Sequence, residues 1–182
     1  NGIHFKSDGL NTFIDLHGDG TRCFYDENDP ATIVYGFLGS GTYYRRIGTN
    51  SPTPYYTSIV FDGSKPDYEK DNPAELDSKS NIFYSGSTLG KYTRIKFNNS
   101  NNLQISLPPN YSSYRVSCIK IDPEEDNSIW IGLFNATQVP KLLKVQNANT
   151  NSPAFIDKGV SSFPTGSWLN SIYFSGRNNN DN

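Results

Sequence analysis

A short strand–turn–strand phrase recurs along the chain and constrains its fold more than any other feature. An apolar strand ends in an acidic or small residue, a turn follows, and a second apolar strand ends at glycine or serine. Copies begin at Cys23, Ile59 and Ile119, and the first half returns as Ile172-Tyr173-Phe174-Ser175. Repetition at this spacing predicts a row of small β-sheets.

The repeating unit extends to four short strands. A third strand follows a glycine or proline in each copy, and a fourth strand is recognisable in two copies. The third strands are segments 3–6, 42–45, 91–94 and 141–144, and the fourth strands are 12–15 and 154–157. Helical periodicity is absent, and turn residues separate the strands. The predicted fold class is therefore all-β, a β-propeller segment of four-stranded antiparallel blades.

The whole chain is predicted to belong to one propeller domain. In this frame it contains a blade end at 1–17, full blades at 18–54, 55–110 and 111–165, and a partial blade at 166–182. Propellers usually have about 4–8 blades. We therefore favour a segment of a larger propeller over a four-blade ring closed by the two partial ends. The absence of methionine, even at position 1, also suggests an excised or processed piece.

Composition excludes two classes of partner. The net charge of −2 gives no electrostatic basis for binding nucleic acid. No apolar run approaches the roughly 20 residues that a membrane helix needs. The two cysteines, Cys23 and Cys118, fall on neighbouring positions of the repeat and so on opposite strand faces, which favours free thiols over a disulfide.

Two stretches resemble a known group of propellers. The segment Lys6-Ser7-Asp8-Gly9-Leu10-Asn11-Thr12-Phe13 resembles a degenerate Asp-box of sialidase-type (BNR) propellers. The phrase from Gly18-Asp19-Gly20 to Ile33-Val34-Tyr35-Gly36 resembles blades of large secreted bacterial propellers, related to VPS10-like ones. The resemblance implies the fold and a secreted or cell-surface location. It implies little about activity, because the motif is structural.

Several acidic residues are predicted to shape turns rather than to act chemically. They are Asp8 and the residues that close the first strands, Asp26, Asp62 and Asp122, since an Asp side chain accepts hydrogen bonds from following backbone N–H groups. The acidic stretch 63–80 is placed as an insertion between the first and second strands of the second blade. Its carboxylates suit calcium, but lysines interrupt them, so we predict a solvated loop and no metal site.

The candidate ligand-binding residues lie just before each first strand. The resemblance implies that ligands meet the propeller face that carries the loops between fourth and first strands. Residues at that face are Asp19, Tyr55, Tyr56, Tyr114, Arg115 and Trp168. Tyrosine and tryptophan rings stack on sugars or anchor peptides. The alternative is that these aromatics pack between blades beneath the loops.

Catalytic constellations are incomplete. Glycoside hydrolysis needs two carboxyl groups about 5–9.5 Å apart, and Asp19 is the one candidate at the predicted face. The resemblance to sialidases implies three converging arginines, but the arginines do not share one repeat position. Metal-ligand spacing, a nucleophile elbow and a phosphate-binding glycine loop are also missing, so no cofactor is predicted.

The sequence therefore predicts a non-catalytic module of a secreted or surface protein that binds a glycan or a protein. Two other interpretations stay open. One is a glycoside hydrolase that uses Asp19 with a second carboxylate outside this segment. The other is a spacer in a larger surface assembly.

Overall fold

The computed structural model describes residues 2–7, 11–17, 20–28, 32–37, 42–47, 55–60, 73–97, 101–159 and 162–175. Over these ranges the backbone forms strands, turns and one short 3-10 helix, Pro109–Tyr111. The strands are β1 (Gly2–Ser7), β2 (Asn11–His17), β3 (Gly20–Tyr25), β4 (Thr32–Phe37), β5 (Thr42–Ile47), β6 (Tyr55–Val60), β7 (Ala74–Asp77), β8 (Ile82–Gly86), β9 (Lys91–Lys96), β10 (Asn101–Ser106), β11 (Arg115–Ile121), β12 (Ile129–Phe134), β13 (Lys141–Gln146) and β14 (Ala154–Asp157).

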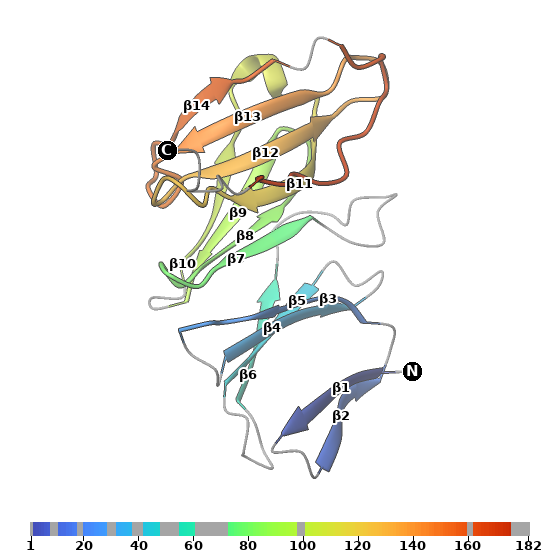
Figure 1. The fold of residues 1–182 in the computed structure, drawn as a ribbon, viewed down its shortest axis with the longest axis vertical. Coiled ribbons are helices and arrows are strands. Elements are labelled where there is room, and N and C mark those ends of the chain that lie inside the picture. Colours follow the sequence, from blue (N-terminus) through green and yellow to red (C-terminus); the bar gives the residue numbers. More distant parts are fainter. Residues whose placement is uncertain are drawn as a thin grey trace, which may run out of the picture.

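The strands form a hairpin and three four-stranded sheets. Strands β1 and β2 make the N-terminal hairpin, β3–β6 make sheet I, β7–β10 make sheet II and β11–β14 make sheet III. Within each sheet, consecutive strands pair antiparallel. The prediction of an all-β chain built from four-stranded antiparallel units is confirmed. Figure 1 shows the units following one another in chain order, from the hairpin in blue to sheet III in orange.

The predicted boundary between the first two units is wrong. Tyr55–Val60 is the last strand of sheet I, because it pairs along its length with β5. The first strand of sheet II is Ala74–Asp77, which pairs with β8. Its sequence, Ala-Glu-Leu-Asp, carries too weak an apolar signal to compete with the run at Ile59. The acidic stretch is therefore not an insertion between first and second strands: β7 and β8 are joined by the short turn 78–81, and residues 61–72 lie outside the described residues.

Sheet II is buried on both faces. Successive side chains of a strand point to opposite faces, so Phe83 packs toward sheet I with Val34 and Ile95. Its neighbour Tyr84 packs toward sheet III. The core between sheets II and III takes alternate residues of the facing strands, among them Tyr92, Ile105, Val116, Ile119, Ile129, Ile131, Leu133, Leu143 and Val145. Sheets stacked through such apolar faces account for most of the described core.

A buried aspartate closes the first strand of every four-stranded sheet. Asp26, Asp77 and Asp122 each accept a hydrogen bond from a backbone N–H two or three residues further on, at 2.9, 3.1 and 2.9 Å. The predicted turn role of Asp26 and Asp122 is confirmed. Asp62 lies outside the described residues, and Asp77 takes the corresponding position in sheet II.

The turns that follow Asp77 and Asp122 also share a backbone conformation. Asn81 and Asn127 adopt positive φ angles of 55° and 59°, a region in which Asn is tolerated better than most residues. The carbonyl of each Asn accepts a hydrogen bond from the turn between third and fourth strands, from Phe97 N–H at 3.1 Å and Ala148 N–H at 2.8 Å. The repeat therefore extends from strand order to individual hydrogen bonds.

The predicted final strand, Ile172–Ser175, is not a strand. This segment crosses the face of sheet III that points away from sheet II and runs beside β11 (Figure 1). Side-chain packing holds it: the Trp168 ring lies 4.2 Å from that of Phe134, and Phe174 lies 6.0 Å from Trp130. It pairs with no strand among the described residues, and Tyr173 within it is largely exposed.

Both cysteines are free thiols, as predicted, although only Cys118 is buried and Cys23 is exposed. Cys118 lies opposite Gly132 on the outer face of sheet III. A Cβ at Gly132 would lie 2.4 Å from the Cys118 Sγ, so glycine makes room for the thiol there.

Candidate functional site

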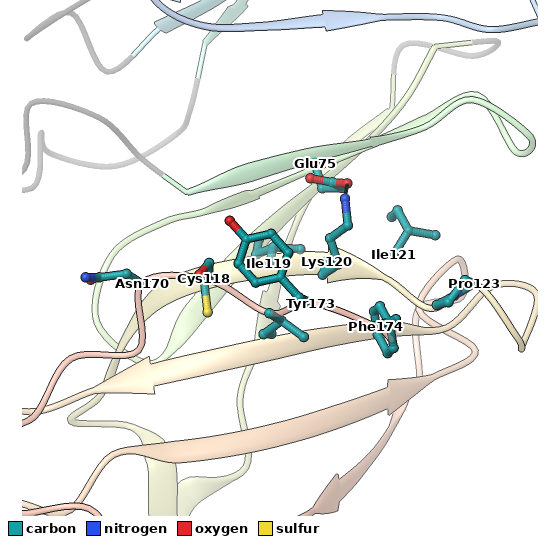
Figure 2. A pocket seen from close by; sticks show the side chains of 11 residues that line it. Glu75, Cys118, Ile119, Lys120, Ile121, Pro123, Asn170, Tyr173 and Phe174 are labelled. Carbon is teal, nitrogen blue, oxygen red and sulfur yellow. Dashed lines mark hydrogen bonds and ion pairs between the residues drawn. The ribbon is translucent and has the colours of Figure 1, made fainter. Parts of the chain in front are cut away.

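A groove of about 470 Å³ opens where the first strands of sheets II and III meet residues 162–175, the C-terminal segment (Figure 2). Its volume falls in the range of roughly 300–1,000 Å³ that is usual for ligand sites. The lining comes from β7, from β11 and the turn after it, and from five consecutive residues of the C-terminal segment. These residues are Glu75, Cys118, Ile119, Lys120, Ile121, Pro123, Asn170, Ser171, Ile172, Tyr173 and Phe174.

Three of the polar side chains at the groove occupy the same position of the repeat. Glu75, Lys120 and Tyr173 each stand two residues before the residue that closes, or is predicted to close, a first strand. Because β11 lies against β7, equivalent positions of successive copies come to the same place. The equivalent residue of sheet I is Phe24, which packs edge-on against Phe83 at 5.4 Å. The groove therefore forms where equivalent positions of successive repeats meet.

The charges in the groove neutralise each other. The Lys120 ammonium donates to the Glu75 carboxylate, and Figure 2 shows the two groups meeting above β11. These side chains are partly exposed, so a ligand can reach both. The Tyr173 side chain stands at the groove and is 88% exposed. A neutral polar pair beside an exposed ring and an isoleucine floor suits a polar ligand with apolar parts.

Three of the predicted ligand residues are not placed near this groove. Asp19 lies outside the described residues. Tyr55 and Tyr56 begin β6, between the third and fourth strands of sheet I, so they do not precede a first strand as predicted. The premise of their prediction, a position just before a first strand, is therefore wrong, because the second copy was misplaced.

Tyr114 is buried and packs beneath the surface, as the alternative interpretation of these aromatics expects. Its side chain is 2% exposed, its hydroxyl donates to the Val139 carbonyl at 3.1 Å, and its ring meets Tyr111 at 5.9 Å. Arg115 and Trp168 do come together around Phe134: Arg115 is its partner across β11 and β12, and the Trp168 ring packs against the Phe134 ring at an interplanar angle of 39°. Neither residue lines the groove.

Four groove residues were not among those predicted from the sequence: Glu75, Lys120, Asn170 and Tyr173. A signal for Lys120 was present, because a lysine between Ile119 and Ile121 interrupts an otherwise apolar strand. The matching signal at Glu75 was hidden by the misplaced first strand of sheet II.

A second cluster of charged side chains, on sheet III, binds other groups of the same sheet. The Asp122 carboxylate accepts from the Trp130 indole at 2.9 Å and from the Lys144 ammonium at 2.7 Å. Lys144 also binds Glu125 at 2.7 Å. Burial raises the pKa of Asp122, but hydrogen bonds from Lys144, the Glu124 N–H and Trp130 outweigh burial and lower it. An ionised carboxylate held by that many donors fixes the turn and is not available as a general acid.

Comparison with known proteins identifies a fold neighbour. No family model and no curated protein matches the chain. Within the described residues, no helix has the length and apolar character that crossing a membrane requires. The chain resembles the crystal structure of a functionally unknown protein from Desulfotomaculum acetoxidans DSM 771, with a TM-score of 0.53 and 15% identity. The match covers 86% of this chain and 46% of that one, so the chain spans about half the neighbour's length. At this identity the similarity concerns the fold alone.

Proposed function

We propose that the chain is part of a β-propeller of the Asp-box, VPS10-like kind and that its sheets are blades. Three features support this: each sheet is a four-stranded meander, neighbouring sheets pack through apolar faces, and the first strands of neighbouring sheets lie together. These are the relations expected of blades arranged around an axis. The groove then lies along the inner, axis-facing side of the blades.

In this proposal the chain is a non-catalytic binding module of a secreted or cell-surface protein, and a glycan or protein ligand occupies the groove. The observation that carries it is the convergence of Glu75, Lys120 and Tyr173 from equivalent repeat positions onto one groove. An exposed aromatic ring beside polar groups is a common recognition surface. The ion pair adds orientation without net charge.

A glycoside hydrolase is less well supported. Its two carboxyl groups need a separation of about 5–9.5 Å. Among the described residues, Glu75 is the single carboxylate that lines the groove, and Lys120 already binds it. A second acid would have to come from residues such as Asp19 that lie outside the described residues.

A binding screen tests the proposal. The purified chain is applied to a glycan array and to a library of extracellular proteins and peptides, and every ligand found is measured again with Tyr173→Ala and Lys120→Ala. We expect each variant to lose about tenfold in affinity, the loss typical of a contact worth about 1.4 kcal/mol.

Two exposed residues elsewhere give matched controls. Tyr25 is 55% exposed, and Lys79 forms an exposed ion pair with Asp126. Tyr25→Ala and Lys79→Ala are expected to bind as the wild type does. Unchanged binding by both groove variants would overturn the proposed site. Turnover of a polysaccharide that Glu75→Gln abolishes would overturn the non-catalytic assignment.

A further inference from the structure

Strand β11 is an edge strand whose open side faces the groove. It is the first strand in the order of sheet III and pairs with β12 alone. An edge strand presents a row of N–H and C=O groups that another chain can pair with. Because four consecutive residues of β11 line the groove, this row is accessible to a ligand there.

The register identifies which backbone groups face the groove. Asp122 N–H donates to the Ser128 carbonyl at 2.9 Å, so this pair is of the hydrogen-bonded type. Hydrogen-bonded and non-hydrogen-bonded pairs alternate along an antiparallel ladder. Lys120 opposite Trp130 is then hydrogen-bonded, whereas Ile119 and Ile121 are not. The N–H and C=O groups of Ile119 and Ile121 therefore point away from β12, toward the open edge.

Nothing in the described part of the chain occupies those four backbone groups. Residues 170–174 run along the other side of the groove, yet no backbone hydrogen bond joins them to β11 among the described residues. A lysine in an edge strand normally discourages pairing. Here the Lys120 ammonium pairs with Glu75 on β7, so an added strand has to displace or flank this ion pair.

We propose that the groove binds an extended peptide, which adds to sheet III as a fifth strand along β11. This inference rests on the proposed function, that the groove is a ligand site, and names the ligand class. The main chain of the peptide pairs with Ile119 and Ile121, the mode of recognition known as β-strand addition. Alternate peptide side chains then point toward Glu75 on β7 and toward Tyr173 and Phe174 on the C-terminal segment. We expect an apolar or aromatic residue at the positions that face Tyr173.

The test begins with random 12-residue peptides displayed on phage and selected on the purified chain. A selected peptide is synthesised with a single N-methyl group at each position in turn. Because only every second residue of an added strand donates its N–H to the edge, N-methylation is expected to weaken binding about tenfold at alternate positions. Intervening positions should tolerate it. Sensitivity without alternation would overturn strand addition.

A substitution in β11 tests the same bond from the protein side. Proline is accepted in edge strands where its missing N–H would face away from the sheet, so Ile121→Pro removes a donor for the ligand and leaves the pairing with β12 in place. We expect Ile121→Pro to lose about tenfold in peptide affinity and Ile121→Val to keep it. Circular dichroism at the binding temperature checks that both variants are folded. If Ile121→Pro unfolds, the N-methyl series decides alone.

The outcomes separate this inference from the proposed function. If glycans but no peptides bind, and Tyr173→Ala weakens them, the groove is a ligand site and strand addition is wrong. If a peptide binds equally well to wild type, Tyr173→Ala and Ile121→Pro, its site lies elsewhere and both proposals fail. Alternating N-methyl sensitivity together with loss in Tyr173→Ala supports both.

Discussion

Sheets II and III carry the same kind of side-chain pair on the face that points toward the next part of the chain, but the two faces have different surroundings. Tyr84 lies opposite Arg94 on sheet II, and Trp130 lies opposite Lys144 on sheet III. Arg94 is 3% exposed and reaches across to the next sheet, where its Nη2 donates to Asn151 Oδ1 at 2.8 Å and its Nη1 to two carbonyls. Lys144 instead binds carboxylates of its own sheet, on Asp122 and Glu125.

The difference shows what one repeat position does in two surroundings. Where another sheet follows, the cation joins two sheets and the face becomes core. Where the C-terminal segment follows, the cation binds carboxylates of its own sheet, and the groove lies between β11 and that segment. The same repeat position therefore serves packing between sheets in one unit and an ion-pair network within a sheet in the next.

Neighbouring leucines of β13 provide the largest contrast. Leu143 is fully buried between sheets II and III, whereas Leu142 is half-buried on the outer face. Leu143→Ala should lower the free energy of unfolding by about 2–5 kcal/mol, and Leu142→Ala by about 1 kcal/mol, since it loses less buried apolar surface. Urea unfolding monitored by fluorescence measures both. Equal losses would mean that the two faces are buried alike.

Replacement of Arg94 and replacement of Lys144 should destabilise different parts of the molecule. Arg94→Met is expected to cost about 1–3 kcal/mol, because it leaves the buried Ala148 carbonyl and the partly buried Thr150 carbonyl without this donor. Amide hydrogen exchange should accelerate at residues 148–151, which form the turn between β13 and β14 of sheet III. Lys144→Met should instead accelerate exchange in the turn 122–128 of its own sheet. Acceleration at 148–151 in both variants would contradict the comparison.

Gly132 tests how closely the C-terminal segment covers the outer face. A Cβ at this position would lie 2.4 Å from the Cys118 Sγ and 3.1 Å from the Leu169 Cβ. Overpacking of this kind typically costs about 1–3 kcal/mol, so Gly132→Ala should be destabilised by about that amount. Adding Cys118→Ala should restore part of the stability, because it removes the closest atom. A double variant no more stable than Gly132→Ala would show that the contact with Cys118 is not the cause.

The smallest expected effect is a pH dependence of the outer face. Hydrogen bonds outweigh burial and hold the pKa of Asp122 below its usual 3.8. Its ionised form therefore stabilises the fold above pH of about 4, and this contribution is lost as pH falls through the lowered pKa. We expect the melting temperature to fall below about pH 4. The fall should be shallower in Asp122→Asn. An identical pH profile in that variant would exclude Asp122 as a source.

Much of the fold could be predicted from runs of apolar residues. The strands around Ile33, Ile82 and Ile129 stand out because three apolar residues follow one another, and the strand around Ile119 stands out by its apolar residues before the turn-forming Asp122. Ala74–Asp77 was missed because half of its side chains are acidic. Its strand character comes from pairing with β8, and sequence alone does not reveal that partner.

The site could be predicted less well, because it depends on relations between copies. Glu75 meets Lys120 only through the side-by-side placement of β7 and β11. Tyr114 and Trp168, which were predicted as ligand residues, show the same limit of prediction from sequence. An aromatic residue before a strand suits both packing and ligand contact. Only the structure distinguishes the two residues: Tyr114 is 2% exposed, whereas Trp168 is 38% exposed.

Amide hydrogen exchange along β11, measured residue by residue by NMR, tests the central claim most directly. The account predicts fast exchange at Ile119 and Ile121, whose N–H groups face the groove, and slow exchange at Cys118 and Lys120, whose N–H groups bind β12. Addition of a groove-binding peptide should slow Ile119 and Ile121 and leave the other two unchanged. Uniform protection along β11 in the free protein would contradict the open edge and, with it, the proposed site for an added strand.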